Sequence, residues 1–173
     1  MSHDDATPVQ KLTVDVKARI AARCGFRGDQ DDHTGAQDLT VAHTLVIPFQ
    51  LDCNTPFVIG VKSQHGAFAA DRTPDGSGFA FTKAYRLSLD IGTNGQALTP
   101  AACDSTALTA PGAPGAACAF YGAKPGQGLS SGKLISIDRP SSMSLSWDGQ
   151  GAGPRNVAGR YSDTITITVS ART

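Results

Sequence analysis

The chain has 173 residues, enough for one domain with a core of ordinary size. Its 15 basic and 15 acidic residues give a formal net charge of zero, so charge gives no reason to expect binding to nucleic acid or to an anionic membrane. Charged residues make up only 17%, and Gly (19) and Pro (10) are frequent, which favours an extracellular all-β protein over a cytosolic enzyme.

No apolar run is long enough to span a bilayer, so we expect no membrane insertion. The first ten residues, MSHDDATPVQ, are polar and acidic and do not resemble a secretory signal. We therefore expect a mature or recombinant form, from which the signal peptide, if the protein has one, is missing. The four cysteines form no C-x-x-C pair, which favours disulfides in an oxidising compartment over a zinc site and leaves three pairings open.

The first pattern along the chain is a strict alternation of apolar and polar residues from Leu12 to Cys24. Thr13, Asp15 and Lys17 lie between the apolar positions, so a strand here has one apolar and one wet face. A helix would scatter the apolar residues around its circumference. The pattern predicts one long strand, with apolar positions at Leu12, Val14, Val16, Ala18, Ile20, Ala22 and Cys24.

A polar loop is predicted over residues 25–38, followed by a second long strand over 41–53. Pro48 on the other face of that strand indicates an edge or a bulge. Residues 57–61 predict a third strand and residues 85–91 a fourth.

Residues 97–118 lack periodicity and are predicted to form a long loop with a cysteine near each end. Two short strands are expected at 134–137 and 143–147, and a last one over 161–169. About seven short strands joined by Gly- and Pro-rich loops are typical of an antiparallel β-sandwich.

The terminal strands are both long, β-branched and apolar on one face, and an exposed edge of this kind is a template for pairing. The chain ends soon after the last strand, so we expect an immunoglobulin-like sandwich that lacks its final strand. The N-terminal run could fill the resulting groove by strand addition, from a neighbouring copy. The prediction is an N-terminal extension (1–20) with donor residues Leu12, Val14, Val16, Ala18 and Ile20, and a domain (21–173) with groove residues Tyr161, Ile165, Ile167 and Val169.

The alternative is that the N-terminal strand folds back onto its own chain. The protein would then be a self-complete β-sandwich binding module, such as a lectin-like adhesin or a spore coat protein.

Three segments carry a resemblance to a known family: LTVDVKARIAARC (12–24), FQLDC (49–53) and GRYSDTITITVS (159–170). They resemble subunits of chaperone–usher pili, most closely the archaic branch with the spore coat protein U-like domain. Tyr121-Gly122 is a weaker similarity. The resemblance implies a Cys24–Cys53 disulfide, which leaves Cys103 to pair with Cys118; the second pair is not a feature of the whole family.

The resemblance further implies an incomplete immunoglobulin-like fold held in the periplasm by a chaperone that lends a strand. It also implies export through an outer-membrane usher and homopolymerisation with identical subunits by donor-strand complementation. The product would be a cell-surface fimbrium for adhesion and biofilm formation. A single domain with a good donor segment favours a shaft subunit over a tip adhesin.

Signals for chemistry are weak, and we expect no enzyme, metal or cofactor. The loop with Asp29, Asp31, Asp32 and His33 lacks the frame of a calcium hand and is interpreted as a solvated loop. GQGLSSGKL (126–134) lacks the first Gly and the Ser/Thr of a phosphate loop. His43 is interpreted as a core or rim residue and Trp147 as core, and no G-x-S-x-G motif is present.

Overall fold

The computed structural model describes residues 11–27, 37–110 and 117–172, and its strands form three antiparallel sheets. The largest has the order β1-β2-β9-β6-β7. Its strands are β1 (Cys24–Arg27), β2 (His43–Cys53), β9 (Ser136–Trp147), β6 (Arg86–Asp90) and β7 (Cys103–Asp104). The all-β, antiparallel part of the predicted fold class is therefore confirmed.

The two smaller sheets have three strands each, and a single 3₁₀-helix, η1 (Ser105–Leu108), completes the regular structure among the described residues. One sheet has the order β10-β4-β5, with β10 (Tyr161–Ser162), β4 (Phe68–Ala70) and β5 (Thr82–Lys83). The other has the order β11-β3-β8, with β11 (Ile165–Ala171), β3 (Phe57–Ser63) and β8 (Leu129–Ser130).

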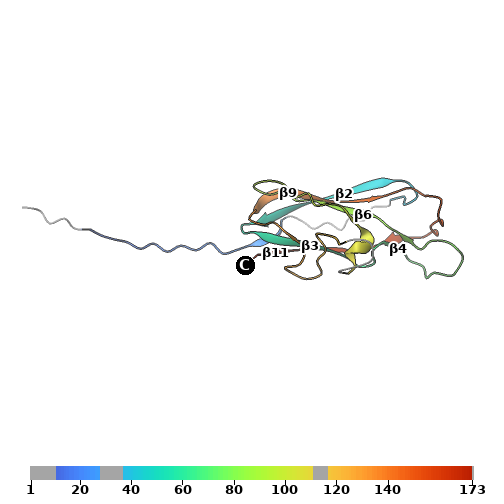
Figure 1. Cartoon of the computed structure of the whole chain (residues 1–173), viewed down its shortest axis with the longest axis horizontal. Coiled ribbons are helices and arrows are strands. Elements are labelled where there is room, and N and C mark those ends of the chain that lie inside the picture. Colours follow the sequence, from blue (N-terminus) through green and yellow to red (C-terminus); the bar gives the residue numbers. More distant parts are fainter. Residues whose placement is uncertain (1–10, 28–36, 111–116, 173) are drawn as a thin grey trace, which may run out of the picture.

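The core lies between the five-stranded sheet and the two smaller ones. In Figure 1, β2, β6 and β9 run along one face of the body, and β3, β11 and β4 run along the other. Side chains from both faces form one buried cluster, because alternate residues of each strand point inward. Its fully buried members include Leu51, Phe57, Ile59, Val61 and Leu87.

The N-terminal pattern is divided by the structure into two parts. Residues 11–23 form no strand, and only Cys24–Arg27 pair, against the end of β2. The prediction of one long paired strand from Leu12 to Cys24 is therefore wrong for this chain alone, and so is the predicted loop at 25–27. The alternation itself continues into β1, since Phe26 keeps the apolar phase that begins at Leu12.

The last predicted strand is also divided. β10 pairs with β4, whereas β11 pairs with β3 along its whole length. The break falls at Asp163, whose side chain is fully buried and accepts hydrogen bonds from Ser63 Oγ (2.5 Å) and Tyr85 Oη (2.6 Å). Because this carboxylate turns into the body, the backbone leaves one sheet and enters another.

Two other predictions need correction. The two strands expected at 134–137 and 143–147 are one strand, β9, which passes through Pro140. β9 pairs with β6 only from Ser142 onward, and Pro140 precedes this paired stretch. No residue of β6 therefore needs the N–H that Pro140 lacks. The loop expected over 97–118 contains β7 and η1, which are too short to show a period.

The disulfides join Cys24 to Cys53 and Cys103 to Cys118, the pairing expected from the sequence and the resemblance. The first links β1 to the end of β2, and the second links β7 to the loop before Tyr121.

Candidate functional site: an exposed tail and an open strip

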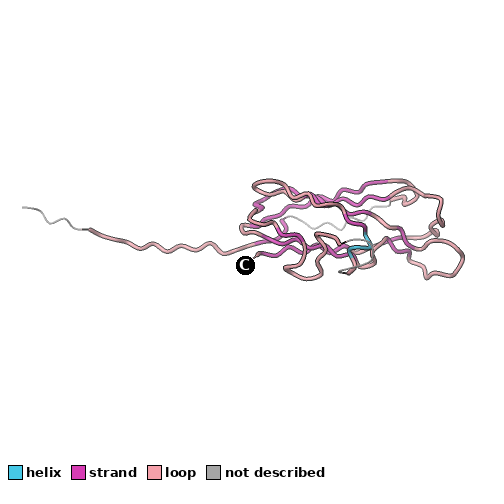
Figure 2. The backbone as a smooth tube through the Cα atoms, in the orientation of Figure 1, coloured by secondary structure: helices cyan, strands magenta, loops and turns pink. Residues whose placement is uncertain are grey.

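Residues 11–20, called the tail here, extend away from the body without a strand partner (Figures 1 and 2). Every tail residue is exposed. Four large apolar side chains are among the most exposed of the described residues: Leu12 (87%), Val14 (68%), Val16 (84%) and Ile20 (87%). An apolar row of this length on the surface normally marks a contact with another molecule.

The body has a matching region whose apolar side chains are only half covered. On β2 the inward positions Leu45, Ile47 and Phe49 are half-buried, although the same strand is fully buried at Leu51. β1 pairs only with Gln50–Cys53 of β2, so no described strand covers this edge of β2 before Gln50. The core is therefore incompletely closed along half of β2.

The same holds for β11, which is an edge strand with β3 as its one partner among the described strands. Its apolar residues pack against the core but stay half-buried, whereas β3 next to it is almost entirely buried. β1 contacts β11, so the two half-covered regions adjoin. We call the set the open strip: Phe26, Leu45, Ile47, Phe49, Ile165, Ile167 and Val169.

The structure separates the site residues expected from the sequence into three places. The donor positions lie on the tail and contact no strand of the body in this chain. Ile165, Ile167 and Val169 lie on β11. Tyr161 lies on β10, in a different sheet, where its hydroxyl donates to Val157 O at 2.7 Å, so it is not part of the open strip.

Four strip residues were not among the predicted site residues: Phe26, Leu45, Ile47 and Phe49. Their signal was present, since Phe26 continues the even-numbered apolar phase and the other three occupy the odd apolar positions of residues 41–53. What the sequence did not show is that none of the described strands pairs with this edge of β2 before Gln50. Phe26 and Phe49 meet edge to face, with ring centroids 5.6 Å apart.

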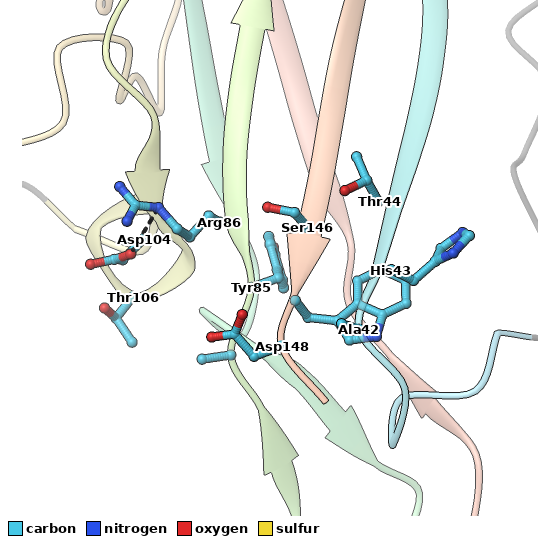
Figure 3. Close-up of a pocket in the computed structure, with 11 residues that line it drawn as sticks. Ala42, His43, Thr44, Tyr85, Arg86, Asp104, Thr106, Ser146 and Asp148 are labelled. Carbon is cyan, nitrogen blue, oxygen red and sulfur yellow. Dashed lines mark ion pairs between the residues drawn. The ribbon is translucent and has the colours of Figure 1, made fainter. Parts of the chain in front are cut away.

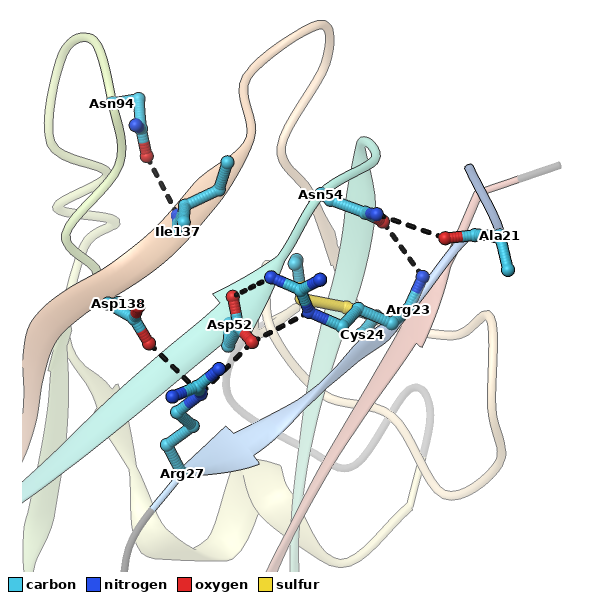
Figure 4. Close-up of polar contacts among 10 residues, drawn as sticks. Ala21, Arg23, Cys24, Arg27, Asp52, Asn54, Asn94, Ile137 and Asp138 are labelled. Atoms are coloured by element: carbon cyan, nitrogen blue, oxygen red, sulfur yellow. Dashed lines mark hydrogen bonds and ion pairs between the residues drawn. A yellow bond between two sulfur atoms is a disulfide. The ribbon is translucent and has the colours of Figure 1, made fainter. Parts of the chain in front are cut away.

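The base of the tail is held by a charged cluster (Figure 4). Asp52, with a side chain only 6% exposed, accepts from Arg23 Nε (2.8 Å) and Nη2 (3.1 Å) and from Arg27 Nε (3.1 Å). Arg27 also pairs with Asp138 at 3.0 Å. The hydrogen bond from Arg23 is the main cause that lowers the pKa of Asp52, and the same contact raises the pKa of Arg23.

This cluster predicts a loss of stability in acid. Because the pKa of Asp52 is lower in the fold than its unfolded value of about 3.9, its ionised form stabilises the protein above that pH, and the contribution is lost as the pH falls through the folded pKa. Chemical denaturation of the wild type and Asp52→Asn between pH 7 and 3 checks this. The difference in the free energy of unfolding between the two proteins should shrink below about pH 4. A difference that stays constant down to pH 3 contradicts the prediction.

A hollow of about 870 Å³ lies at the opposite end of β2 from the tail base (Figure 3). Several of its polar groups are already paired within the chain. Arg86 lies 3.7 Å from Asp104, and Trp147 Nε1 donates to Val41 O at 3.1 Å. Trp147 is 5% exposed, which confirms it as a core residue, and His43 is an exposed rim residue with its ring 5.4 Å from that of Trp147.

The Asp-rich loop with Asp29, Asp31, Asp32 and His33 lies outside the described residues. Within the described ranges, no group of three or more His, Cys, Asp or Glu side chains could hold a metal ion. The described part of the chain also has no helix with the length and apolar character needed to cross a bilayer.

In comparisons with protein-family models and with curated proteins, the chain matches none. The features of this chain that bear on function are therefore the tail and the open strip.

Proposed function

We propose that this protein is a structural subunit of a bacterial cell-surface fibre. Each copy is an incomplete immunoglobulin-like β-sandwich, and the tail of one copy completes the open strip of the next. The observation that carries the proposal is that one chain has both an unpartnered, alternating apolar segment and a half-covered apolar edge of its core.

The two parts are complementary in chemistry and length. The part of the tail from Leu12 to Ile20 is nine residues long and β11 has seven, so this extended segment can run along the whole of β11. Alternate tail side chains would enter the strip while Thr13, Asp15, Lys17 and Arg19 face water. Burial of the four larger side chains would contribute about 6–12 kcal/mol as an upper bound.

Backbone hydrogen bonding supports the same partner. An edge strand such as β11 presents a row of N–H and C=O groups that another extended segment can pair with. Exposed apolar edges are unusual in finished domains because they promote aggregation. A donated strand satisfies both the backbone groups of β11 and the half-covered side chains beside it.

The self-complete binding module requires the N-terminal strand to pack on its own chain. Here Leu12, Val16 and Ile20 are each more than four-fifths exposed at 87%, 84% and 87%, which favours donation to another copy.

The route of assembly in the proposal comes from the resemblance. A periplasmic chaperone would cover the strip until an outer-membrane usher delivers the next tail, and the product would be a fimbrium for adhesion and biofilm formation. The two disulfides are in keeping with an oxidising compartment such as the periplasm.

A peptide with the sequence of residues 11–21, KLTVDVKARIA, should bind the open strip of the full-length protein. Because a strand that completes the core binds only the folded state, saturating peptide should raise the melting temperature by 10 °C or more and stop fibre growth. Calorimetry and electron microscopy of the purified protein check both results.

The control peptide has the same composition in an order that breaks the alternation. Equal effects of the two peptides, or no effect of either on a protein that remains monomeric, would reject the donor-strand function.

A further inference from the structure

Three consecutive residues, the last two of β2 and Asn54 after them, hold the base of the tail (Figure 4). Asp52 binds the guanidinium of Arg23 through two hydrogen bonds. Cys53 forms the disulfide with Cys24. Asn54 binds the backbone on both sides of Ala22.

The contacts of Asn54 form a closed pattern. Its Oδ1 accepts from Arg23 N at 2.8 Å, its Nδ2 donates to Ala21 O at 3.0 Å, and its own backbone N–H donates to Arg23 O at 3.1 Å. An amide side chain suits this position because it offers a donor and an acceptor together. Ala21 is the first described residue of the chain that the body holds by a hydrogen bond in this way.

We propose that Asn54 is a positioning residue that fixes the point at which the donated strand leaves its own body. The proposal depends on the proposed function, because position matters only when the tail lies in a neighbour. With Asn54 in place, no free linker separates Ile20, the last donor residue, from Ala21, the first held residue. Consecutive bodies in the fibre are then set at a short, defined spacing.

Asn54 also determines where tension enters the body. A pull on the donated strand reaches Ala21 first, and the two side-chain hydrogen bonds pass it to the turn between β2 and β3. Without them the pull reaches Arg23, which is still held by its ion pair with Asp52 and by the hydrogen bond from the Asn54 backbone N–H to its carbonyl. Release of residues 21 and 22 adds up to about 7 Å of chain, at about 3.3–3.6 Å per residue.

The first test is amide hydrogen exchange of the full-length protein, read at the Arg23 amide. Asn54→Ala should accelerate exchange about tenfold, because two hydrogen bonds that hold this segment are lost. Asn54→Asp keeps the oxygen that accepts from Arg23 N–H, so this amide should stay protected. Asn94→Ala is the matched control, since Asn94 Oδ1 accepts from Ile137 N at 2.8 Å in the same way but does not touch the tail.

The second test is extension of single fibres in an optical trap. Asn54→Ala fibres should lengthen by up to about 7 Å more per subunit than wild-type or Asn94→Ala fibres. Unchanged exchange at Arg23 in Asn54→Ala overturns the proposal, and so does faster exchange with unchanged extension, because that result makes the contact structural only. If the wild type forms no fibres, the donor-strand function is rejected and the role of Asn54 in the fibre is rejected with it. The exchange experiment still reports separately whether Asn54 holds residues 21–23 in the single chain.

Discussion

Val16→Asp is expected to abolish fibre formation while leaving the melting temperature of the isolated subunit unchanged. Val16 is 84% exposed in the free chain, so the substitution removes no contact there. In the proposed fibre the same side chain would enter an apolar strip, where the substitution would lose about 1.5–3 kcal/mol of burial and place a carboxylate without a partner. Electron microscopy and unboiled gels measure assembly, and calorimetry measures the subunit; Ile20→Asp should behave alike.

The matched control for this experiment is Thr13→Asp, which adds the same charge to the opposite face of the tail. Thr13 faces water in the proposed complex, so this variant should assemble as the wild type does. Normal fibres from Val16→Asp, or equal loss of assembly in both variants, would show that the tail does not insert with its even-numbered face.

Asp163→Ala is expected to destabilise the body itself by about 3–5 kcal/mol. The fully buried carboxylate accepts hydrogen bonds from Ser63 Oγ, Tyr85 Oη and the backbone N–H of His65 and Thr164, at 2.5 to 3.0 Å. Its loss leaves buried donors without an acceptor and frees the junction between β10 and β11. Urea denaturation at pH 7 measures the change in the free energy of unfolding.

Two further variants serve for comparison, one that removes a single hydrogen bond to Asp163 and one that removes an exposed carboxylate. Tyr85→Phe removes one of these hydrogen bonds and should cost about 1.5–3 kcal/mol, since the acceptor is charged. Asp104→Ala removes an exposed carboxylate, 64% accessible, and should stay within about 0.5 kcal/mol of the wild type. A cost below about 1 kcal/mol for Asp163→Ala would mean that its contacts contribute little to holding the sheets together.

Long alternating segments were predicted well from the sequence because one buried face leaves a period of two. The positions of β2 and β3 follow directly from their apolar residues, and β6 from the run at Leu87 and Leu89. The all-β class and the antiparallel pairing follow from the same signal. The finer description, a sandwich lacking one strand, belongs to the proposed function.

The features that the sequence did not predict depend on contacts between distant residues. Asp163 looks like one more polar residue on a strand, and only its bonds to Ser63 and Tyr85 show why the strand breaks there. β7 and β10 have two residues each, too few for a period. The contacts of Asn54 could not be predicted from the sequence, because they are made with the backbone of residues 21 and 23 and leave no periodic pattern.

The one-sided character of the tail has a consequence for how the free protein behaves. Amyloid spines need dry, interdigitated faces between stacked sheets, and short charge-poor segments supply them. Here Asp15, Lys17 and Arg19 place a charge on three successive positions of the wet face, so tails stacked parallel and in register would set like charges against one another. Under the proposed function, this charge pattern would favour joining one edge at a time and would protect a subunit that awaits its neighbour from uncontrolled self-association.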